Sequence, residues 1–440
     1  MTNIAVVVLD TLRKDSFDQE FGWVPGVAFD NAWSTSHWTV PAHSSLFTGE
    51  YASKLGVYAR SPYFSSQEPA LAERLKQWDY RTRGFSANPQ ISAAFNFDRG
   101  FDELKGNWRT KHLNAENLFD WHSLTSSNGL VEAGLKGILK SIISDVNTVD
   151  SLALGFDNYM ARSDSTLFYR GGGVMEAIHQ LQEWDFDERE FLFLNLMDAH
   201  APYRPPEEYR SVSQEDVDLV GTLNHILGQE TVDGYLLKSA YHDSVTYLSK
   251  KYKQLFNLMN ETFDVIITLS DHGELLGEHG MWGHGHGVYP ELTKIPLVIS
   301  PGHRVDRDGM TPLSIADLHD IILKFGNPES GGYITESEYE SNQPKVCEYH
   351  GVTHQEERSA LIEEFGQDAV KEFDQWLAGV VDDEMYYYET YKGKQKEGNG
   401  NEEQMEELLQ NVKTEFQSKE VNSRSAPTEV SEHLKDLGYI

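Results

Sequence analysis

The chain has 440 residues, with 37 Lys and Arg against 70 Asp and Glu, and a formal net charge of −33. Its length suits one large domain with a smaller one, and so negative a surface repels nucleic acid, which excludes a nucleic-acid partner. The acidic residues are spread along the whole chain. We interpret this as adaptation to high salt in a halophilic archaeal protein, the alternative being a single very acidic protein from elsewhere.

Cysteine content and the N-terminal segment indicate where the protein works. Cys347 is the only cysteine, so an internal disulfide is impossible. The first residues run into an apolar segment without a basic leader, and no apolar run reaches the ~20 residues that span a bilayer. We therefore expect a cytoplasmic protein without a membrane span. The sequence leaves the oligomeric state open.

Apolar segments and predicted helices alternate from residue 3 to about residue 301. This order is typical of an α/β fold with a largely parallel sheet. Residues 108–171 are expected to be irregular and to carry helices that shape the substrate site. The predicted strands are residues 3–9, 80–86, 191–196, 263–269 and 295–299, and the predicted helices are residues 71–78 and 315–325.

The composition changes after about residue 330, where Glu, Tyr and Lys become frequent. Here a strand is predicted at residues 386–391, a flexible turn at 392–401 and a charged helix at 402–416. We therefore predict a catalytic α/β domain over residues 1–330. A smaller acidic C-terminal subdomain, residues 331–440, is expected to pack on it.

Two of the predicted strands end in potential metal ligands. Asp10 follows the first strand, and Asp271 and His272 follow the strand at residues 263–269. Strand ends of an open α/β sheet are where its sites form, and carboxylate and imidazole groups bind divalent metals. The alternative for a lone strand-terminal Asp is a helix N-cap. The Gly- and His-rich loop that follows, to residue 287, extends the predicted site, unless it is only a solvated turn.

A third segment, residues 36–51, makes the comparison with a known family specific. Residues 39–43 read Thr-Val-Pro-Ala-His, and Ser44 to Gly49 follow. The pattern resembles the sulfatase signature, Cys/Ser-x-Pro-x-Arg followed by a small-residue helix and Thr-Gly. Further segments resemble the same family in the same order: residues 9–15, 197–203, 271–299 and 434–439.

This resemblance covers nearly the whole chain. It implies a sulfatase-like member of the alkaline phosphatase superfamily, with a three-layer α/β fold, a large mostly parallel central sheet and a smaller C-terminal subdomain. It also implies hydrolysis of sulfate esters at one divalent metal, held by Asp10, Asp271 and His272. Calcium is the usual metal of the family, with magnesium or manganese in some members, and the imidazole-rich site also makes zinc or manganese possible here.

Thr39 stands at the family's nucleophile position. Family sulfatases carry a Cys or Ser there that is oxidised to formylglycine, and threonine cannot form that aldehyde. Thr39 could still attack directly through its hydroxyl, as in phosphodiesterase and phosphotransferase relatives. The alternative is that Thr39 caps the helix that begins near Pro41.

Three histidines match other catalytic positions of the family. His43 replaces the arginine of the signature, with a structural histidine as the alternative. His200 resembles the acid that protonates the leaving group, and His284 occupies the place of a lysine that contacts the ester.

Three further residues are predicted to bind substrate. Arg13 matches a position that supports the metal site, Asn88 lies near strand-end substrate contacts, and His286 could be a further ligand or acid. Of the histidines in the loop, His279 is expected to be a bystander.

Three functions therefore compete. The first is hydrolysis of a sulfate ester. The second is a Thr-dependent phosphodiesterase, phosphonate hydrolase or phosphotransferase on the same fold. The third is a non-catalytic member that binds an anionic partner. In each case the partner is an anionic sulfate or phosphate ester, or a similar anion.

Overall fold

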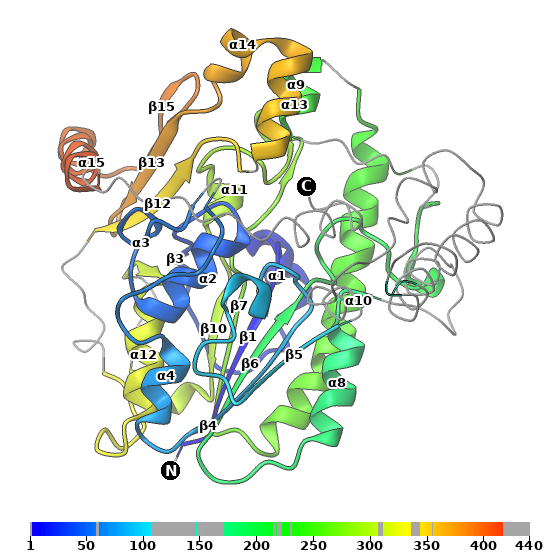
Figure 1. The fold of residues 1–440 in the computed structure, drawn as a ribbon, viewed down its shortest axis with the longest axis vertical. Helices are drawn as coiled ribbons and strands as arrows, with labels where there is room; N and C mark the ends of the chain where they lie inside the picture. The colour runs from blue at the N-terminus through cyan, green and yellow to red at the C-terminus, as the bar shows by residue number, and fades with distance from the viewer. Residues whose placement is uncertain are drawn as a thin grey trace.

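The computed structural model describes residues 2–58, 61–107, 147, 151, 171–213, 217, 222–228, 231–306, 311–335, 344–353 and 355–416 (Figure 1). Nearly all of the region predicted to be irregular, residues 108–171, lies outside this part of the chain. The family-like ending at residues 434–439 lies outside it as well.

A seven-stranded sheet forms the centre of the molecule. Its order is β2-β10-β7-β1-β6-β4-β5. β1 pairs in parallel with both β6 and β7, whereas β10 runs antiparallel to its two neighbours, β7 and β2. The predicted α/β fold with a mostly parallel sheet is therefore confirmed. The strands are β1 (Ile4–Leu9), β2 (Val27–Ala28), β4 (Arg81–Ser86), β5 (Glu103–Gly106), β6 (Glu190–Leu196), β7 (Val265–Leu269) and β10 (Leu297–Ser300).

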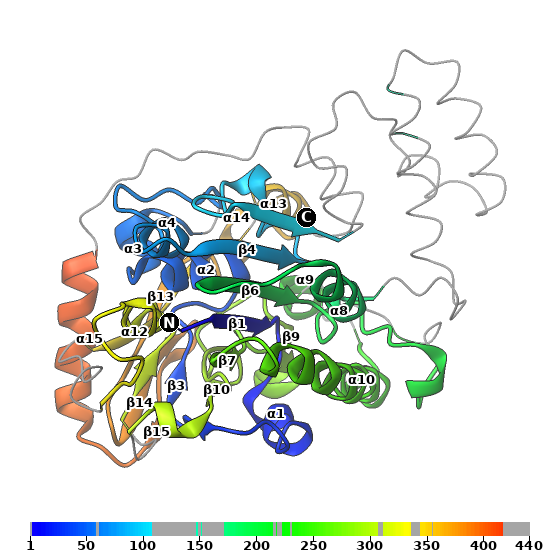
Figure 2. The same cartoon turned by 90° about the horizontal axis from the view of Figure 1, so that it is seen from below.

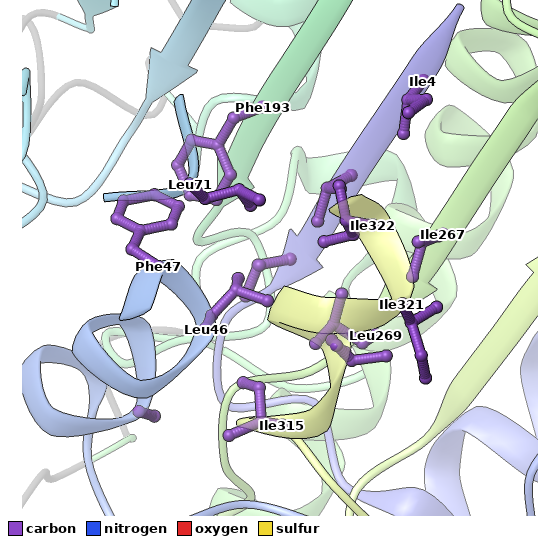
Figure 3. Packing of buried hydrophobic residues seen from close by; sticks show 14 of the residues in the cluster. Ile4, Leu46, Phe47, Leu71, Phe193, Ile267, Leu269, Ile315, Ile321 and Ile322 are labelled. Atoms are coloured by element: carbon purple, nitrogen blue, oxygen red, sulfur yellow. The ribbon is translucent and has the colours of Figure 1, made fainter. Parts of the chain in front are cut away.

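Side chains alternate between the two faces of this sheet, and each face is covered by helices (Figure 2). On β1, Ile4 and Val6 belong to one apolar cluster, and Ala5 and Val7 to the other. Figure 3 shows the first cluster, where Phe193 of β6 packs beside residues of the covering helices. One face carries α2 (Thr39–Thr48), α4 (Leu71–Lys76) and α12 (Asp317–Gly326), and the other carries α1 (Lys14–Glu20), α8 (Val174–Glu183) and α10 (Gly234–Asn260).

A second, antiparallel sheet lies in the C-terminal part, in the order β12-β13-β14-β15. α15 (Glu402–Phe416) packs on one face through Met405, Leu409 and Val412, and its bounds match the predicted helix. The strands are β12 (Lys345–His350), β13 (Trp376–Val381), β14 (Met385–Thr390) and β15 (Gly393–Gly398).

The prediction of a flexible turn at residues 392–401 was wrong, because most of that segment forms β15. Every β15 residue is exposed, and the strand reads Gly-Lys-Gln-Lys-Glu-Gly. Because this strand has no apolar face, its sequence lacks the alternation of apolar and polar residues that predicts a strand. Pairing with β14 across a tight hairpin orders it instead.

The opposite face of the small sheet covers the loops that follow β7. Cys347, Tyr349 and Tyr386 pack there with Leu275 and Tyr289. β12 also contacts the segment before α2: the amide of Glu348 donates to the Thr35 carbonyl at 2.9 Å, and Ser36 Oγ donates to the Glu348 carbonyl at 3.1 Å. The small sheet therefore supports residues 35–36. The domain boundary at residue 330 stays a prediction.

Short elements complete the described part of the chain. They are β3 (Ala32–Trp33), β8 (Leu275–Leu276), β9 (Trp282–Gly283), β11 (Leu313–Ser314), α3 (Ala52–Leu55), α9 (Thr222–Gly228), α11 (Pro290–Thr293), α13 (Gln355–Phe365) and α14 (Gln367–Lys371). Among the described residues, none of the helices has the length and apolar character needed to cross a bilayer.

Candidate functional site

Adjacent strands bring the three predicted metal ligands together. Asp10 follows β1, and Asp271 and His272 follow β7, its hydrogen-bonded neighbour. One ligand atom from each residue lies within 4.8 Å of the others, and all three side chains are fully buried. Thr11 adopts a left-handed turn (φ 59°), and its amide donates to Asp271 Oδ1 at 3.4 Å. The turn after β1 thus fixes the Asp271 carboxylate.

The donor atoms of this cluster suit a divalent cation. Among the described residues, buried Asp10 Oδ1 and Asp271 Oδ2 have no hydrogen-bond partner. Burial raises the pKa of Asp271 to about 7, and burial together with the Asp271 charge raises that of Asp10. Two buried carboxylates without a counter-ion are costly, and a divalent cation would neutralise both.

His272 presents a neutral nitrogen to the same point. Its Nδ1 donates to the Gly273 carbonyl at 2.9 Å, which leaves the lone pair on Nε2. Nε2 lies 3.5 Å from Asp271 Oδ2 and 3.9 Å from Asp10 Oδ1. Burial lowers the pKa of His272 to about 4, so the ring is uncharged at neutral pH. The cluster therefore offers the two hard oxygens and one nitrogen expected of a divalent-metal site.

Thr39 is the first residue of α2, and its hydroxyl faces this cluster. Thr39 Oγ1 lies 3.4 Å from His272 Nε2 and 3.5 Å from Asp10 Oδ2, and the residue is 3% exposed. The capping alternative was wrong, because Trp38 occupies the N-cap position and no side-chain cap bond forms. The hydroxyl instead sits where the helix N-terminus favours an anion.

Asn88 and His43 hold Thr39 and its neighbours in place. Asn88 Nδ2 donates to Asp10 Oδ2 at 2.9 Å and lies 3.3 Å from Thr39 Oγ1. His43 Nδ1 donates to the Thr39 carbonyl at 2.9 Å, and His43 Nε2 accepts from Asn195 Nδ2 at 2.9 Å. Burial lowers the pKa of His43 to about 3. Both ring nitrogens of neutral His43 are therefore engaged in hydrogen bonds to other residues of the protein.

His200 and His284 lie together beside the cluster and are partly exposed. Their ring centroids are 5.2 Å apart, and the ring of His284 is 4.7 Å from that of His272. Burial lowers the pKa of His200. Burial also lowers the pKa of His284, but the Glu274 carboxylate outweighs it, so the pKa is raised overall. The structure thus brings both predicted histidines to the metal-ligand cluster.

Arg13 lies at the edge of this arrangement. Its guanidinium pairs with Asp15 at 2.7 Å and Glu278 at 3.0 Å, and donates to the Glu274 carbonyl at 3.0 Å. Among the described residues, its recorded partners do not include Asp10, Asp271 or His272. Arg13 therefore joins the loop after β1 to the loop after β7.

His286 is enclosed by aromatic rings. It is 0% exposed, and its ring lies 4.7 Å from Tyr349, 5.3 Å from Phe373 and 5.8 Å from Tyr391. Burial lowers its pKa to about 3, and neither ring nitrogen has a hydrogen-bond partner among the described residues. These three rings belong to the C-terminal part of the chain. His286 therefore lies in different surroundings from His284. His279, the expected bystander, pairs with Glu291 at 3.2 Å.

Sequence reasoning gave no role to three residues of this site: Asn195, Tyr203 and Glu274. Asn195 lies in β6, where a polar residue within the otherwise apolar run of residues 191–196 was the available signal. Tyr203 Oη donates to Glu274 Oε2 at 2.9 Å, and Glu274 also pairs with His284. The signal for Glu274 was its place in the Asp-His-Gly-Glu segment.

Comparisons with known proteins agree with this geometry. Over 349 residues the chain is 25% identical to "Uncharacterized sulfatase YidJ" of Escherichia coli (strain K12), covering 73% of this chain and 64% of that protein. It is 22% identical over 393 residues to the choline-sulfatase of Rhizobium meliloti (strain 1021), covering 75% and 70%. The chain thus spans about two thirds of the length of these relatives.

A solved structure and a family model extend the comparison. The phosphonate monoester hydrolase SpPMH from Silicibacter pomeroyi superposes with a TM-score of 0.60 at 16% identity, covering 94% of each chain, which shows a shared fold. The model of the sulfatase family matches residues 18–323, most of the chain. The protein therefore belongs to the sulfatase family of ester hydrolases, within the alkaline phosphatase superfamily.

Proposed function

We propose that the protein hydrolyses anionic esters at a single divalent-metal site, with the Thr39 hydroxyl as the attacking group. One observation carries this proposal: Thr39 Oγ1 lies within 3.5 Å of both Asp10 Oδ2 and His272 Nε2, at the N-terminus of α2. A nucleophile, an anion-binding helix end and a metal-ligand cluster thus meet at one point.

The cation would be held by Asp10, Asp271 and His272. When bound, it supplies charge neutralisation for the anionic ester and a lowered pKa for a coordinated hydroxyl. Calcium is the family's metal, the carboxylate oxygens also suit magnesium, and the imidazole ligand also suits manganese or zinc.

The remaining residues have separate roles in the proposed reaction. Thr39 Oγ forms a bond to the phosphorus or sulfur atom as the bond to the leaving oxygen breaks. His200, neutral because burial lowers its pKa, takes up the Thr39 hydroxyl proton and passes it to the leaving oxygen. Water then hydrolyses the ester formed on Thr39, which regains its hydroxyl proton. Asn88 orients the hydroxyl, His43 fixes the Thr39 backbone, and His284 contacts the ester oxygens.

Two substrate classes remain for this site: sulfate esters, and phosphorus esters such as diesters and phosphonate monoesters. The choline-sulfatase relative supports the first class, and the fold shared with SpPMH is consistent with the second. The unmodified threonine favours phosphorus esters, because it cannot form the formylglycine that sulfatases use. A non-catalytic anion-binding protein would not need this hydroxyl beside the metal-ligand cluster.

A panel of aryl substrates tests the proposal. A sulfate ester, a phosphate monoester, a phosphate diester and a phosphonate monoester should be assayed in high salt with calcium, magnesium, manganese or zinc. We expect turnover of at least one phosphorus ester, dependent on added metal and abolished by a chelator. Binding of these anions without turnover of any of them would instead favour the non-catalytic function.

We also propose a halophilic source for the protein, because the chain is strongly acidic. With a net charge of −33, self-repulsion is screened over roughly 3 Å at about 1 M salt but over about 10 Å at 0.1 M. The free energy of unfolding should therefore fall as KCl is diluted, and sucrose at equal osmolality should not restore it. Denaturant unfolding at several KCl concentrations measures this, and unchanged stability at low salt would remove the halophilic interpretation.

A further inference from the structure

Three side chains form a hydrogen-bonded chain beside the metal-ligand cluster. Tyr203 Oη donates to Glu274 Oε2 at 2.9 Å, and His284 Nδ1 lies 2.8 Å from Glu274 Oε1. Glu274 is 0% exposed and Tyr203 is 3% exposed. Each carboxylate oxygen therefore has its own partner in a place where water competes little.

Glu274 is also fixed through its backbone and through the Tyr203 ring. Its carbonyl accepts from Arg13 Nη1 at 3.0 Å. The Tyr203 ring packs edge-on against Tyr241 at 5.3 Å, and Tyr241 Oη donates to the Thr11 carbonyl at 3.1 Å. The carboxylate thus has little freedom to move relative to the turn that follows β1.

His284 lies in a loop segment whose backbone is held by Thr222, which donates from Oγ1 to the Trp282 carbonyl at 2.6 Å and accepts from the Gly285 amide at 3.0 Å. His284 itself lies between Gly283, in a left-handed conformation with φ 81°, and Gly285. Because a carboxylate only accepts, His284 Nδ1 must carry the hydrogen in their bond. Among the described residues, Nε2 on the other edge of the ring has no hydrogen-bond partner, and the ring lies beside those of His272 and His200.

We propose that Glu274, held by Tyr203, is a positioning residue that binds Nδ1 of His284 and so turns Nε2 toward the bound ester. The inference rests on the proposed function for the identity of that ester. The positioning role of Glu274 is the same for the neutral and the protonated ring of His284, because Nδ1 donates to the carboxylate in both forms. A merely structural Glu274 would connect the loops without acting through His284.

Two replacements of Glu274 separate these roles. Glu274→Met keeps the chain length but removes both acceptor oxygens, and kcat/KM should fall about 10- to 100-fold. Glu274→Gln should recover most of this loss, because its amide oxygen can accept from Nδ1 while its amide nitrogen donates to Tyr203 Oη. If Glu274→Gln is as slow as Glu274→Met, the positioning role is overturned.

A double-mutant cycle tests whether the effect passes through His284. In a His284→Ala background, Glu274→Met should cause no further loss of kcat/KM, because the group that it positions is gone. Metal affinity, measured by calorimetry, should be the same in the single and double variants. An equal further loss in the His284→Ala background would make Glu274 a structural residue.

Tyr203→Phe offers a milder test with a matched control elsewhere in the fold. Tyr387 Oη donates to Glu406 Oε2 at 2.8 Å where α15 packs on the small sheet, a Tyr–Glu hydrogen bond of similar length to that of Tyr203 and Glu274. Tyr203→Phe should lower kcat/KM several-fold, whereas Tyr387→Phe should leave it unchanged. Equal kinetics for the two variants would count against the positioning chain.

A spectroscopic measurement keeps this inference separate from the proposed function. In ¹⁵N-histidine-labelled protein, with the His284 signals assigned by their loss in His284→Ala, the Nδ1 resonance should shift in Glu274→Met and return toward its original position in Glu274→Gln. Failure of the wild type to turn over any ester would contradict the proposed function alone. An Nδ1 resonance that does not respond to Glu274→Met would overturn the positioning role.

Discussion

Thr39→Ala should abolish turnover, with a loss on the order of 10⁴-fold or more, while the protein still folds and binds metal. The alanine keeps the first position of α2 but removes the hydroxyl that lies 3.5 Å from Asp10 Oδ2. The lost polar contacts should lower the free energy of unfolding by only about 1 kcal/mol. Steady-state rates and denaturant unfolding of the same preparation measure both effects.

Two variants control the Thr39 experiment. Thr39→Ser keeps the hydroxyl and should retain part of the activity. Thr48→Ala removes a threonine from the other end of the same helix, where Oγ1 donates to the Ser44 carbonyl at 2.7 Å, and should leave turnover unchanged. A Thr39→Ala enzyme that remains active would transfer the attacking role to a water molecule.

Asp271→Asn should change stability in opposite directions with and without metal. Burial raises the pKa of Asp271 to about 7 from the 3.8 of an unperturbed carboxyl. A raised pKa means that the folded protein binds this proton more tightly than the unfolded chain does. Protonation of Asp271 therefore adds to the free energy of unfolding below pH 3.8, and this gain is lost as the pH rises through about 7. At pH 8 the metal-free wild type carries a buried charge that asparagine removes, so the metal-free variant should be the more stable protein.

Added metal should reverse this order. A cation at 100 times its Kd stabilises the wild type by about 2.7 kcal/mol, whereas a variant that no longer binds it gains nothing. Turnover by Asp271→Asn should be lost at the same time. Thermal unfolding at pH 8, with a chelator and with each metal, measures both differences.

Asp264→Asn is the matched control for that experiment. It makes the same chemical change just before β7, where Asp264 Oδ2 accepts from the Asn3 amide at 2.8 Å, far along the strand from the cluster. Metal should stabilise this variant as much as the wild type. Equal protection of Asp271→Asn by metal would exclude Asp271 as a ligand.

The sequence predicted the scaffold of the site because its signals are local. The apolar strands that end at Leu9 and Leu269 and the acids that follow are visible in the sequence, and the parallel pairing of β1 with β7 brings Asp10 and Asp271 together. The pattern around Pro41 also predicted a helix beginning near that residue, and the observed helix begins two residues earlier, at Thr39. The catalytic and binding roles of these residues stay predictions.

The surroundings of the other site residues depend on distant parts of the chain. His284 and His286 are two positions apart, yet one contacts Glu274 while the other is enclosed by Tyr349 and Phe373. That difference comes from the packing of the small sheet, which spacing cannot reveal. Similarly, the ion pair of Arg13 could not be predicted from spacing, because its partner Glu278 lies 265 positions away in the sequence.

The contact between β12 and the segment before α2 can form only late in translation. Ser36 and Glu348 are 312 positions apart. At about 5–20 residues per second, the ribosome delivers Glu348 roughly 15–60 s after Ser36. Throughout that time the nascent chain holds the Thr39 segment without its supporting strand. The site is therefore completed late in synthesis, and a chaperone that shields residues 35–36 would act on the half-made protein rather than on the finished one.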